Sequence, residues 1–263
     1  MAQLTTHDDV STAGRAGARA GLAARGVIYL LVGVIAASLA WRGRGQHADQ
    51  RGALTDLAAQ PFGKALVILV AIGLAAYALW QLSQVFTGVA GEEDTAGKRL
   101  RSVASFIVYS ALTVSAISVL AGSRKSQSSQ QEGVTAKVMR HSGGRWIVGI
   151  AGAVIVVVGV VLVVQGVKAT FMKRMRGLPP KTADTIKRLG QVGTIARGVV
   201  FGLAGALVIN AARTYDPRQA RGIDGALRTL LQQPYGRWLT GLAALGLIAF
   251  GLFGLVESRY RKV

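Results

Sequence analysis

The sequence contains no cysteine and only three histidines among 263 residues. The first absence excludes disulfide bonds, thiolate catalysis, cysteine-ligated zinc and iron–sulfur clusters. The histidines, His7, His47 and His141, lie in polar stretches, and no pair has the spacing of metal ligands. Bis-histidine ligation of haem within an apolar segment is therefore also excluded, and the sequence predicts neither a metal nor a cofactor.

Charged residues are scarce as well, at 16% of the chain against about 25% in soluble domains. Mean hydropathy is +0.40. The apolar residues gather in six blocks, at about 25–41, 65–87, 103–121, 147–167, 195–212 and 237–256. Runs of about 17–25 apolar residues match the hydrocarbon core of a bilayer, where a helix satisfies its own backbone. The sequence predicts an all-α integral membrane protein with six transmembrane helices.

One block differs in composition from the others. The third carries six hydroxyl side chains, at Ser102, Ser105, Ser110, Thr113, Ser115 and Ser118. Because such groups favour hydrogen-bonding partners over lipid, we expect this helix to face other helices.

The chain repeats itself three times. "ARGVIYLLVG" (24–33) matches "ARGVVFGLAG" (196–205), with "ASFIVYSALT" (104–113) between them. "QPFGKAL" (60–66) likewise matches "QPYGRWL" (233–239), with "SGGRWIV" (142–148) between them. The copies lie 80 and 92 residues apart at the first motif, and 81 and 92 at the second. We predict two-helix repeats over 17–96, 97–180 and 187–263, after a disordered tail over 1–16. An even number of spans in each repeat makes the three copies parallel.

The loop before each second helix has its own pattern. "GALTDLAAQPFG" (52–63) and "GALRTLLQQPYG" (225–236) place leucines on one helical face before a proline. This pattern predicts short amphipathic helices at the membrane interface, with Gly63 and Gly236 permitting a tight turn. A catalytic or phosphate-binding loop used twice is the poorer interpretation, because no nucleophile, acid or metal ligand accompanies the motif.

These repeated motifs resemble a bacterial membrane family known only as a domain of unknown function (number 1206). Its members look like three tandem two-helix membrane units, and the resemblance runs from about residue 17 to the end. The middle copy departs from the pattern, with Ser105 in place of arginine and Ser142-Gly143 in place of the proline–aromatic pair. The resemblance implies an architecture and no particular activity.

The chain is strongly basic, with a formal net charge of +19. Because the basic residues punctuate the apolar blocks, anionic membrane lipids are favoured as partners over nucleic acid. The N-terminal segment, the second and fourth loops and the C-terminus carry 17 lysines and arginines, against 14 in the other loops. This weak bias predicts the inner (plasma) membrane with both termini cytoplasmic.

Five basic residues occupy matched positions. Arg25 and Arg197 start the first helices of their repeats, and Lys64, Arg145 and Arg237 start the second helices. Two interpretations stay open for them: snorkelling anchors at headgroup height, or contacts to a lipid headgroup or another anion. Three further polar residues, Gln84, Gln165 and Glu257, align 21 residues after the motif glycine, which places them near the opposite interface.

Small residues predict where helices pack. Gly26 and Gly33 recur seven apart in the first block, and Gly198 and Gly205 match them in the fifth, where "GVVFG" adds Gly202. Glycines at such spacing allow close approach of two helices.

No catalytic constellation emerges, since Walker, HExxH and GxSxG motifs are all absent. The sequence favours a non-enzymatic scaffold or accessory subunit that contacts anionic lipid, a larger membrane complex or another copy of itself. The alternative is a small transporter or channel with a polar path between the repeats, lined by Arg25, Arg197, Asn210 and the serines of the third block. A membrane enzyme acting on lipid ranks third.

Overall fold

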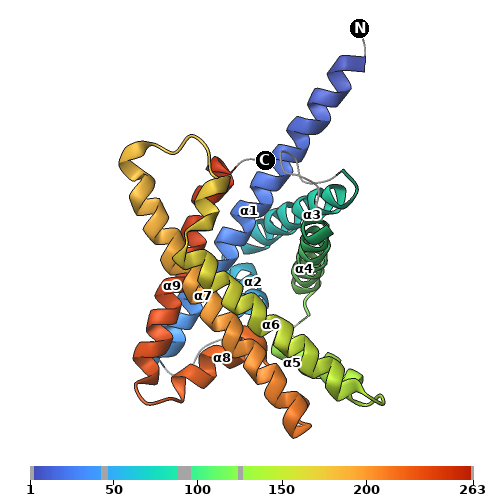
Figure 1. The fold of residues 1–263 in the computed structure, drawn as a ribbon, viewed down its shortest axis with the longest axis vertical. Helices are drawn as coiled ribbons and strands as arrows, with labels where there is room; N and C mark the ends of the chain where they lie inside the picture. The colour runs from blue at the N-terminus through green and yellow to red at the C-terminus, as the bar shows by residue number, and fades with distance from the viewer. Residues whose placement is uncertain (1–2, 43–46, 88–95, 124–126, 262–263) are drawn as a thin grey trace.

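The computed structural model describes residues 3–42, 47–87, 96–123 and 127–261 (Figure 1). The described residues form no β-strand. They form the α-helices α1 (Gln3–Arg42), α2 (Gln50–Ala59), α3 (Gly63–Thr87), α4 (Ala96–Leu120), α5 (Gln127–Met139), α6 (Gly144–Val167), α7 (Pro180–Thr214), α8 (Gly222–Leu231) and α9 (Gly236–Tyr260), and two short 3-10 helices, η1 (Thr170–Arg174) and η2 (Pro217–Gln219).

Six of these helices are long and apolar enough to cross a membrane: α1, α3, α4, α6, α7 and α9. Each contains one of the six predicted blocks, so the predicted all-α membrane fold is confirmed. α1 begins at Gln3 and therefore includes residues 3–16, for which the sequence predicted a disordered tail. That segment contains no proline and extends a helix that is already nucleated, which is energetically easier than starting a new one.

The spans form a cycle in which neighbouring repeats pack together. α9 packs on α1, α3 on α4 and α6 on α7, so the second helix of each repeat contacts the first helix of the next (Figure 1). Within the first and third repeats, α1 packs on α3 and α7 on α9. In the middle repeat, α4 and α6 do not pack side by side over the residues that the structure describes.

Of the three loop helices, α5 contacts both α2 and α8, and the loops carry hydrogen bonds between repeats. Arg51 donates to the Ser123 hydroxyl (2.9 Å), and the Ser128 hydroxyl donates to the Arg221 carbonyl (3.1 Å). The Ala48 N–H donates to the Asp224 carboxylate (2.9 Å). The loops of all three repeats therefore lie at one end of the bundle, which confirms parallel repeats.

The turns before α3 and α9 differ from the prediction in one respect. The left-handed residues are the aromatic ones, Phe62 and Tyr235, both with φ of 61°. The following glycines have another role: a Cβ on Gly63 would lie 1.7 Å from the Leu57 carbonyl oxygen, and Gly236 has a similar clash at 2.0 Å. These glycines are needed for space against the loop helix rather than for their dihedral freedom.

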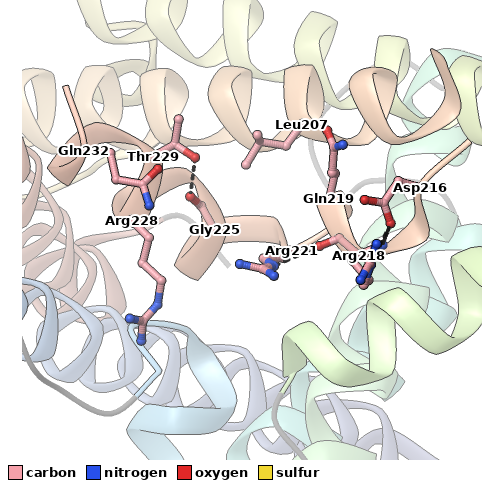
Figure 2. A pocket seen from close by; sticks show the side chains of 9 residues that line it. All are labelled: Leu207, Asp216, Arg218, Gln219, Arg221, Gly225, Arg228, Thr229 and Gln232. Atoms are coloured by element: carbon pink, nitrogen blue, oxygen red, sulfur yellow. Dashed lines mark hydrogen bonds and ion pairs between the residues drawn. The ribbon is translucent and has the colours of Figure 1, made fainter. Parts of the chain in front are cut away.

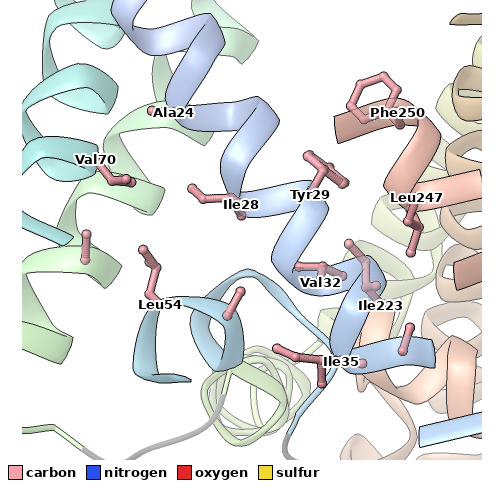
Figure 3. Close-up of a cluster of buried hydrophobic side chains, with 14 of the residues drawn as sticks. Ala24, Ile28, Tyr29, Val32, Ile35, Leu54, Val70, Ile223, Leu247 and Phe250 are labelled. Carbon is pink, nitrogen blue, oxygen red and sulfur yellow. The ribbon is translucent and has the colours of Figure 1, made fainter. Parts of the chain in front are cut away.

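The apolar core joins the loop helices to the spans (Figure 3). Leu54 of α2 and Leu227 of α8 are fully buried, and Ile28 and Val32 of α1 belong to the same cluster. Burying a leucine side chain stabilises a fold by about 1.5–3 kcal/mol. The predicted leucine face is thus the face by which α2 and α8 pack under the spans.

The hydroxyl-rich helix α4 has two different sides. Only 17% of its span is buried inside the bundle. Ser102 is buried and its other hydroxyl residues are half-buried, whereas its exposed side carries apolar residues such as Ile107, Val114 and Ile117. The Thr113 hydroxyl donates to the Tyr109 carbonyl and the Ser118 hydroxyl to the Val114 carbonyl (2.8 Å each). Its hydroxyl side thus faces the bundle, as predicted, and its apolar side is left to face lipid, while backbone carbonyls satisfy these two hydroxyls.

Candidate functional site: two arginines between the repeats

Arg25 lies at a point where all three repeats meet. Its Nη2 donates to the Glu257 carboxylate of α9 (2.5 Å), and its Nη1 donates to the Tyr109 hydroxyl of α4 (3.4 Å). The same guanidinium lies 5.4 Å from the ring centre of Phe250. The second carboxylate oxygen of Glu257 accepts from Arg261 (2.8 Å). With the side chains of Arg25 and Glu257 only 14% and 9% exposed, this is a partly desolvated ion pair.

Arg197, at the matched position of α7, has different surroundings. Its guanidinium lies over three aromatic rings, 4.8 Å from Phe250, 5.0 Å from Tyr29 and 5.0 Å from Phe201. Its Nε is buried without an acceptor, and no carboxylate among the described residues pairs with it. Both guanidiniums thus lie near the Phe250 ring, but Arg25 has a carboxylate partner and Arg197 has aromatic faces alone.

The two arginine sites are built alike. Arg25 contacts Tyr109 of the following repeat, and Arg197 contacts Tyr29 of the repeat that follows it around the cycle. These tyrosines occupy aligned positions. The residue aligned with Glu257 on the neighbour of Arg197 is Gln165, whose side chain is exposed. A missing carboxylate is therefore the principal difference between the two sites.

The structure corrects the predicted location of both arginines along their helices. α1 begins at Gln3 and α7 at Pro180, so Arg25 and Arg197 are internal residues rather than helix starts. Both side chains point into the bundle. The apolar blocks do not show where these two helices start, because each helix begins with a polar segment that precedes its apolar part.

Lys64, Arg145 and Arg237 lie at the other end of the bundle. Each is the second residue of its helix, next to the loop helices, and each is exposed. Arg145 lies 5.7 Å from the ring of Trp146. Because Glu257 is near the last turn of α9 and Arg237 near its first, these three residues do not join the arginine pair.

The predicted packing glycines lie at two of the interfaces between repeats. A Cβ on Gly26 would lie 2.9 Å from the Gly251 carbonyl oxygen, and one on Gly198 would lie 2.7 Å from that of Gly159. Gly33 and Gly205 show the same arrangement two turns further along, against the carbonyls of Ala244 (3.0 Å) and Gly152 (2.8 Å). The α1–α9 and α6–α7 interfaces therefore match residue by residue.

Gly202 differs from the other four glycines. Its backbone lies near Gly159, but a Cβ added to Gly202 itself would meet no atom within 4 Å. The GxxxG spacing thus places one glycine, Gly198, at the close contact and the other beside it.

Comparison with known proteins agrees with this threefold construction. A sequence model described as Domain of Unknown Function (DUF1206) matches three times in tandem, at residues 20–88, 100–169 and 192–261. The chain belongs to the DUF1206 family. It is 32% identical over 250 residues to the uncharacterized protein YxxB of Bacillus subtilis (strain 168), covering 93% of this chain and 90% of that relative. No solved structure matches it.

This DUF1206 chain also has a basic pocket at the end where its loop helices lie (Figure 2). The pocket has a volume of about 310 Å³ and is lined by Arg218, Arg221 and Arg228. Each of these arginines already has a carboxylate partner, at 3.0 Å from Asp216, 3.3 Å from Glu132 and 2.9 Å from Asp224 respectively. The hydrogen bond from Arg218 holds the pKa of Asp216 below its usual value. With its charges compensated, this pocket is a weaker anion site than Arg197.

A buried carboxyl, Asp49, lies near that pocket. It caps α2 by accepting from the Gly52 N–H (2.8 Å), while its Oδ2 is buried without a partner. Burial and the nearby Asp224 carboxylate raise the pKa of Asp49. Asp224 itself accepts from His47 (3.2 Å) and Arg228 (2.9 Å).

Sequence reasoning missed three members of the arginine site: Glu257 as a partner, Phe250 and Tyr109. A signal was available for the first. Glu257 was placed at the side opposite the loops, which is also the side where the first helices begin. The order of helices around the cycle was missing, and only that order makes α9 the neighbour of α1.

Proposed function

We propose that this DUF1206 protein is a non-enzymatic scaffold or accessory subunit of the bacterial plasma membrane that binds an anionic phospholipid headgroup at Arg197. The observation that carries this proposal is the charge of Arg197, which no carboxylate in the described part of the chain compensates. A guanidinium in apolar surroundings is costly unless an anion pairs with it. A lipid phosphate supplies such an anion, in bidentate geometry, at the membrane position where Arg197 lies.

The alternative, a transporter with a path between the repeats, has less support. Such a path would pass the point where the repeats meet. There the rings of Tyr29 and Phe250 lie edge to face, 4.9 Å apart, and both side chains are buried. The surrounding side chains belong to the continuous apolar core. These contacts favour a stable platform over a water-filled route.

The matched architecture offers a direct test. Gln165→Glu puts a carboxylate at the position that Glu257 holds beside Arg25, so it should pair internally with Arg197 and displace the lipid. We expect this variant and Arg197→Gln to lower binding of dioleoyl phosphatidylglycerol about tenfold, the loss of a charged hydrogen bond. Binding is measured by native mass spectrometry of the purified protein. Because Gln165 is exposed, its substitution leaves the fold intact.

Arg237→Gln is the matched control, because it removes an exposed arginine at the opposite end of the bundle. It should leave phosphatidylglycerol binding at Arg197 unchanged. Dioleoyl phosphatidylcholine should bind less well to the wild type, since its zwitterionic headgroup carries no net negative charge. If Gln165→Glu retains phosphatidylglycerol as the wild type does, the proposed headgroup site is wrong.

We propose further that both termini face the cytoplasm. The chain has no cysteine, so single cysteines at Lys64, Arg145 and Arg237 can be introduced cleanly. All three should react with an impermeant maleimide added outside intact cells. Protection of all three would reverse the orientation, and a mixed result would contradict parallel repeats.

A further inference from the structure

A second pocket occupies a place that is solid core in the other two repeats. It has a volume of about 400 Å³ and lies between α5, α6 and α7. Thr135 of α5 lines it. The aligned residues of the other loop helices are Leu54 and Leu227, and both are fully buried.

The walls of the pocket follow the same correspondence. They include Ala151 and Ile155 of α6 and Val208 of α7. Around the first loop helix the aligned residues are the buried Val70 and Leu74 of α3 and Ala116 of α4, and around the third loop helix Leu247 of α9 and Ala36 of α1 are likewise buried. The repeat architecture thus provides for a leucine at this place, and the middle copy has a threonine, which leaves the space open.

The pocket is polar at one end and apolar at the other. Gln127, Gln130 and Gln131 of α5 line it at the loop end. Ala151 and Ile155 lie 7 and 11 residues into α6, which is about 10–17 Å into the span at 1.5 Å per residue. The Oε1 atom of Gln131 is buried without a hydrogen-bond donor. The pocket therefore has a hydrogen-bonding end at headgroup height and an apolar end within the hydrocarbon layer.

We infer that this pocket binds one phospholipid of the leaflet on the loop side, with an acyl chain between α6 and α7 and a hydroxyl-bearing headgroup against Gln131. The acyl chain takes the place of the missing leucine, and a headgroup hydroxyl donates to the free Oε1. The volume falls within the range of about 300–1,000 Å³ that is usual for ligand pockets. Because α6 and α7 are membrane spans, phospholipid is the amphiphile available there. This site is separate from Arg197, which does not line the pocket and lies seven residues before the pocket residue Ala204, about 10 Å along α7.

Filling the pocket tests this inference. Thr135→Leu restores the residue of the other repeats and should lower binding of dioleoyl phosphatidylglycerol at this site at least about fivefold, because the side chain occupies the same volume. Thr135→Val is the matched control, since it keeps the threonine shape and leaves the pocket open. Native mass spectrometry should show one lipid fewer on Thr135→Leu than on Thr135→Val. Equal lipid numbers would overturn the inference.

Two further variants separate folding and the Arg197 site from this result. Ala151→Leu fills the pocket from the opposite wall and should also remove one lipid. If Thr135→Leu lowered lipid binding only by disturbing α5, Ala151→Leu would leave lipid binding unchanged. Thermal unfolding in detergent without added lipid should show Thr135→Leu at least as stable as the wild type, because its leucine packs as Leu54 and Leu227 do. Combined with Gln165→Glu, Thr135→Leu should remove two lipids. Loss of one lipid in that double variant, with Thr135→Leu alone matching the wild type, would reject this pocket and leave the Arg197 site standing.

Discussion

The helices of the first and third repeats pack with their backbones close to neighbouring helices. The middle repeat does so through α6, whereas its other span, α4, makes few such close backbone contacts. At the α1–α9 and α6–α7 interfaces, glycines face each other at aligned positions. At the third interface, α3–α4, the aligned residues are Ala78 and Phe106, and the helices meet through side chains such as Tyr77 and Tyr109, whose rings are 4.4 Å apart. Close approach of two helices therefore depends on glycine at the aligned positions of both helices.

The contacts within each repeat give the same lesson. Gly21 and Gly73 lie in the α1–α3 contact, where a Cβ on Gly21 would be 2.2 Å from Tyr77. Their counterparts Gly193 and Gly246 lie in the α7–α9 contact. In the middle repeat the aligned residues are Arg101 and Val154. Neither position of the middle repeat is a glycine, and α4 does not pack on α6 over the residues that the structure describes.

This divergence decides which helices hold the bundle together. Of the spans in α4 and α6, 17% is buried, against 56% in α1 and α9. The first and third repeats thus form a closed unit, and the middle repeat exposes most of its two spans. The repeated sequence builds the same pair of helices three times, and the positions of the glycines determine how closely the two helices of each pair pack.

The largest expected effect concerns the carboxylate that distinguishes the two arginine sites. Glu257→Gln leaves Arg25 partly buried without its counterion, and such a loss costs about 3 kcal/mol. The free energy of unfolding can be measured by dodecyl sulfate titration in mixed micelles. Arg197→Gln should cost less, about 1 kcal/mol, because it removes only aromatic stacking.

The double variant Arg25→Gln with Glu257→Gln is the control for this prediction. It removes both charges together, so its stability should recover most of what Glu257→Gln alone loses. If Glu257→Gln unfolds as the wild type does, the ion pair makes no net contribution and the two sites are energetically alike.

A smaller effect tests the glycine comparison within a single helix. Gly198→Ala forces a Cβ to within 2.7 Å of the Gly159 carbonyl and should destabilise the protein by about 1–3 kcal/mol. Gly202→Ala, one turn away, meets open space and should gain up to about 1 kcal/mol from helix propensity. The same titration measures both. Equal effects would show that sequence spacing, and not the observed contact, governs packing.

Much of this fold could be predicted because its signals are local. Span length and apolar content fix the six helices, and the aligned motifs fix the three copies and their common direction. The pairing of Arg25 with Glu257 could not be predicted in this way, because 232 residues separate them and their meeting depends on the cyclic order of the repeats. The role of each glycine in the GxxxG motif could not be predicted from spacing either. Only at Gly198 does the Cβ direction point into the helix interface, and at Gly202 it points into open space.

The hydroxyl groups of α4 show a limit of another kind, since they predict which side of the helix faces the bundle and not how much of the helix is buried. A serine or threonine in a membrane span needs a hydrogen-bond partner, and the backbone carbonyl three or four residues earlier can supply it. Sequence shows the need and does not show which partner meets it. The low burial of α4 goes with the absence of a packed α6 beside it among the described residues, which the hydroxyl pattern does not show.

The smallest effect concerns a position where the first and third repeats differ, Asp49 in one and Gly222 in the other. Burial and Asp224 raise the pKa of Asp49 in the folded protein, so the folded state binds its proton more tightly than the unfolded chain does. The stability from this group is present below the ordinary aspartate pKa of about 3.9, and it is lost as pH rises through the folded value.

Asp49→Asn keeps a side-chain acceptor for the Gly52 N–H and removes the titration. We expect Asp49→Asn to unfold with less pH dependence between pH 4 and 7, and to be more stable than the wild type at pH 7 by about 1 kcal/mol, because the variant buries no charged carboxylate. Thermal unfolding across this range measures both.

Asp216→Asn is the control, because the pKa of Asp216 is lowered and its removal should change the slope of stability against pH in the opposite sense. A wild-type protein whose stability rises with pH where Asp49 titrates would show that this carboxyl is folded in its charged form and that its free oxygen has a partner.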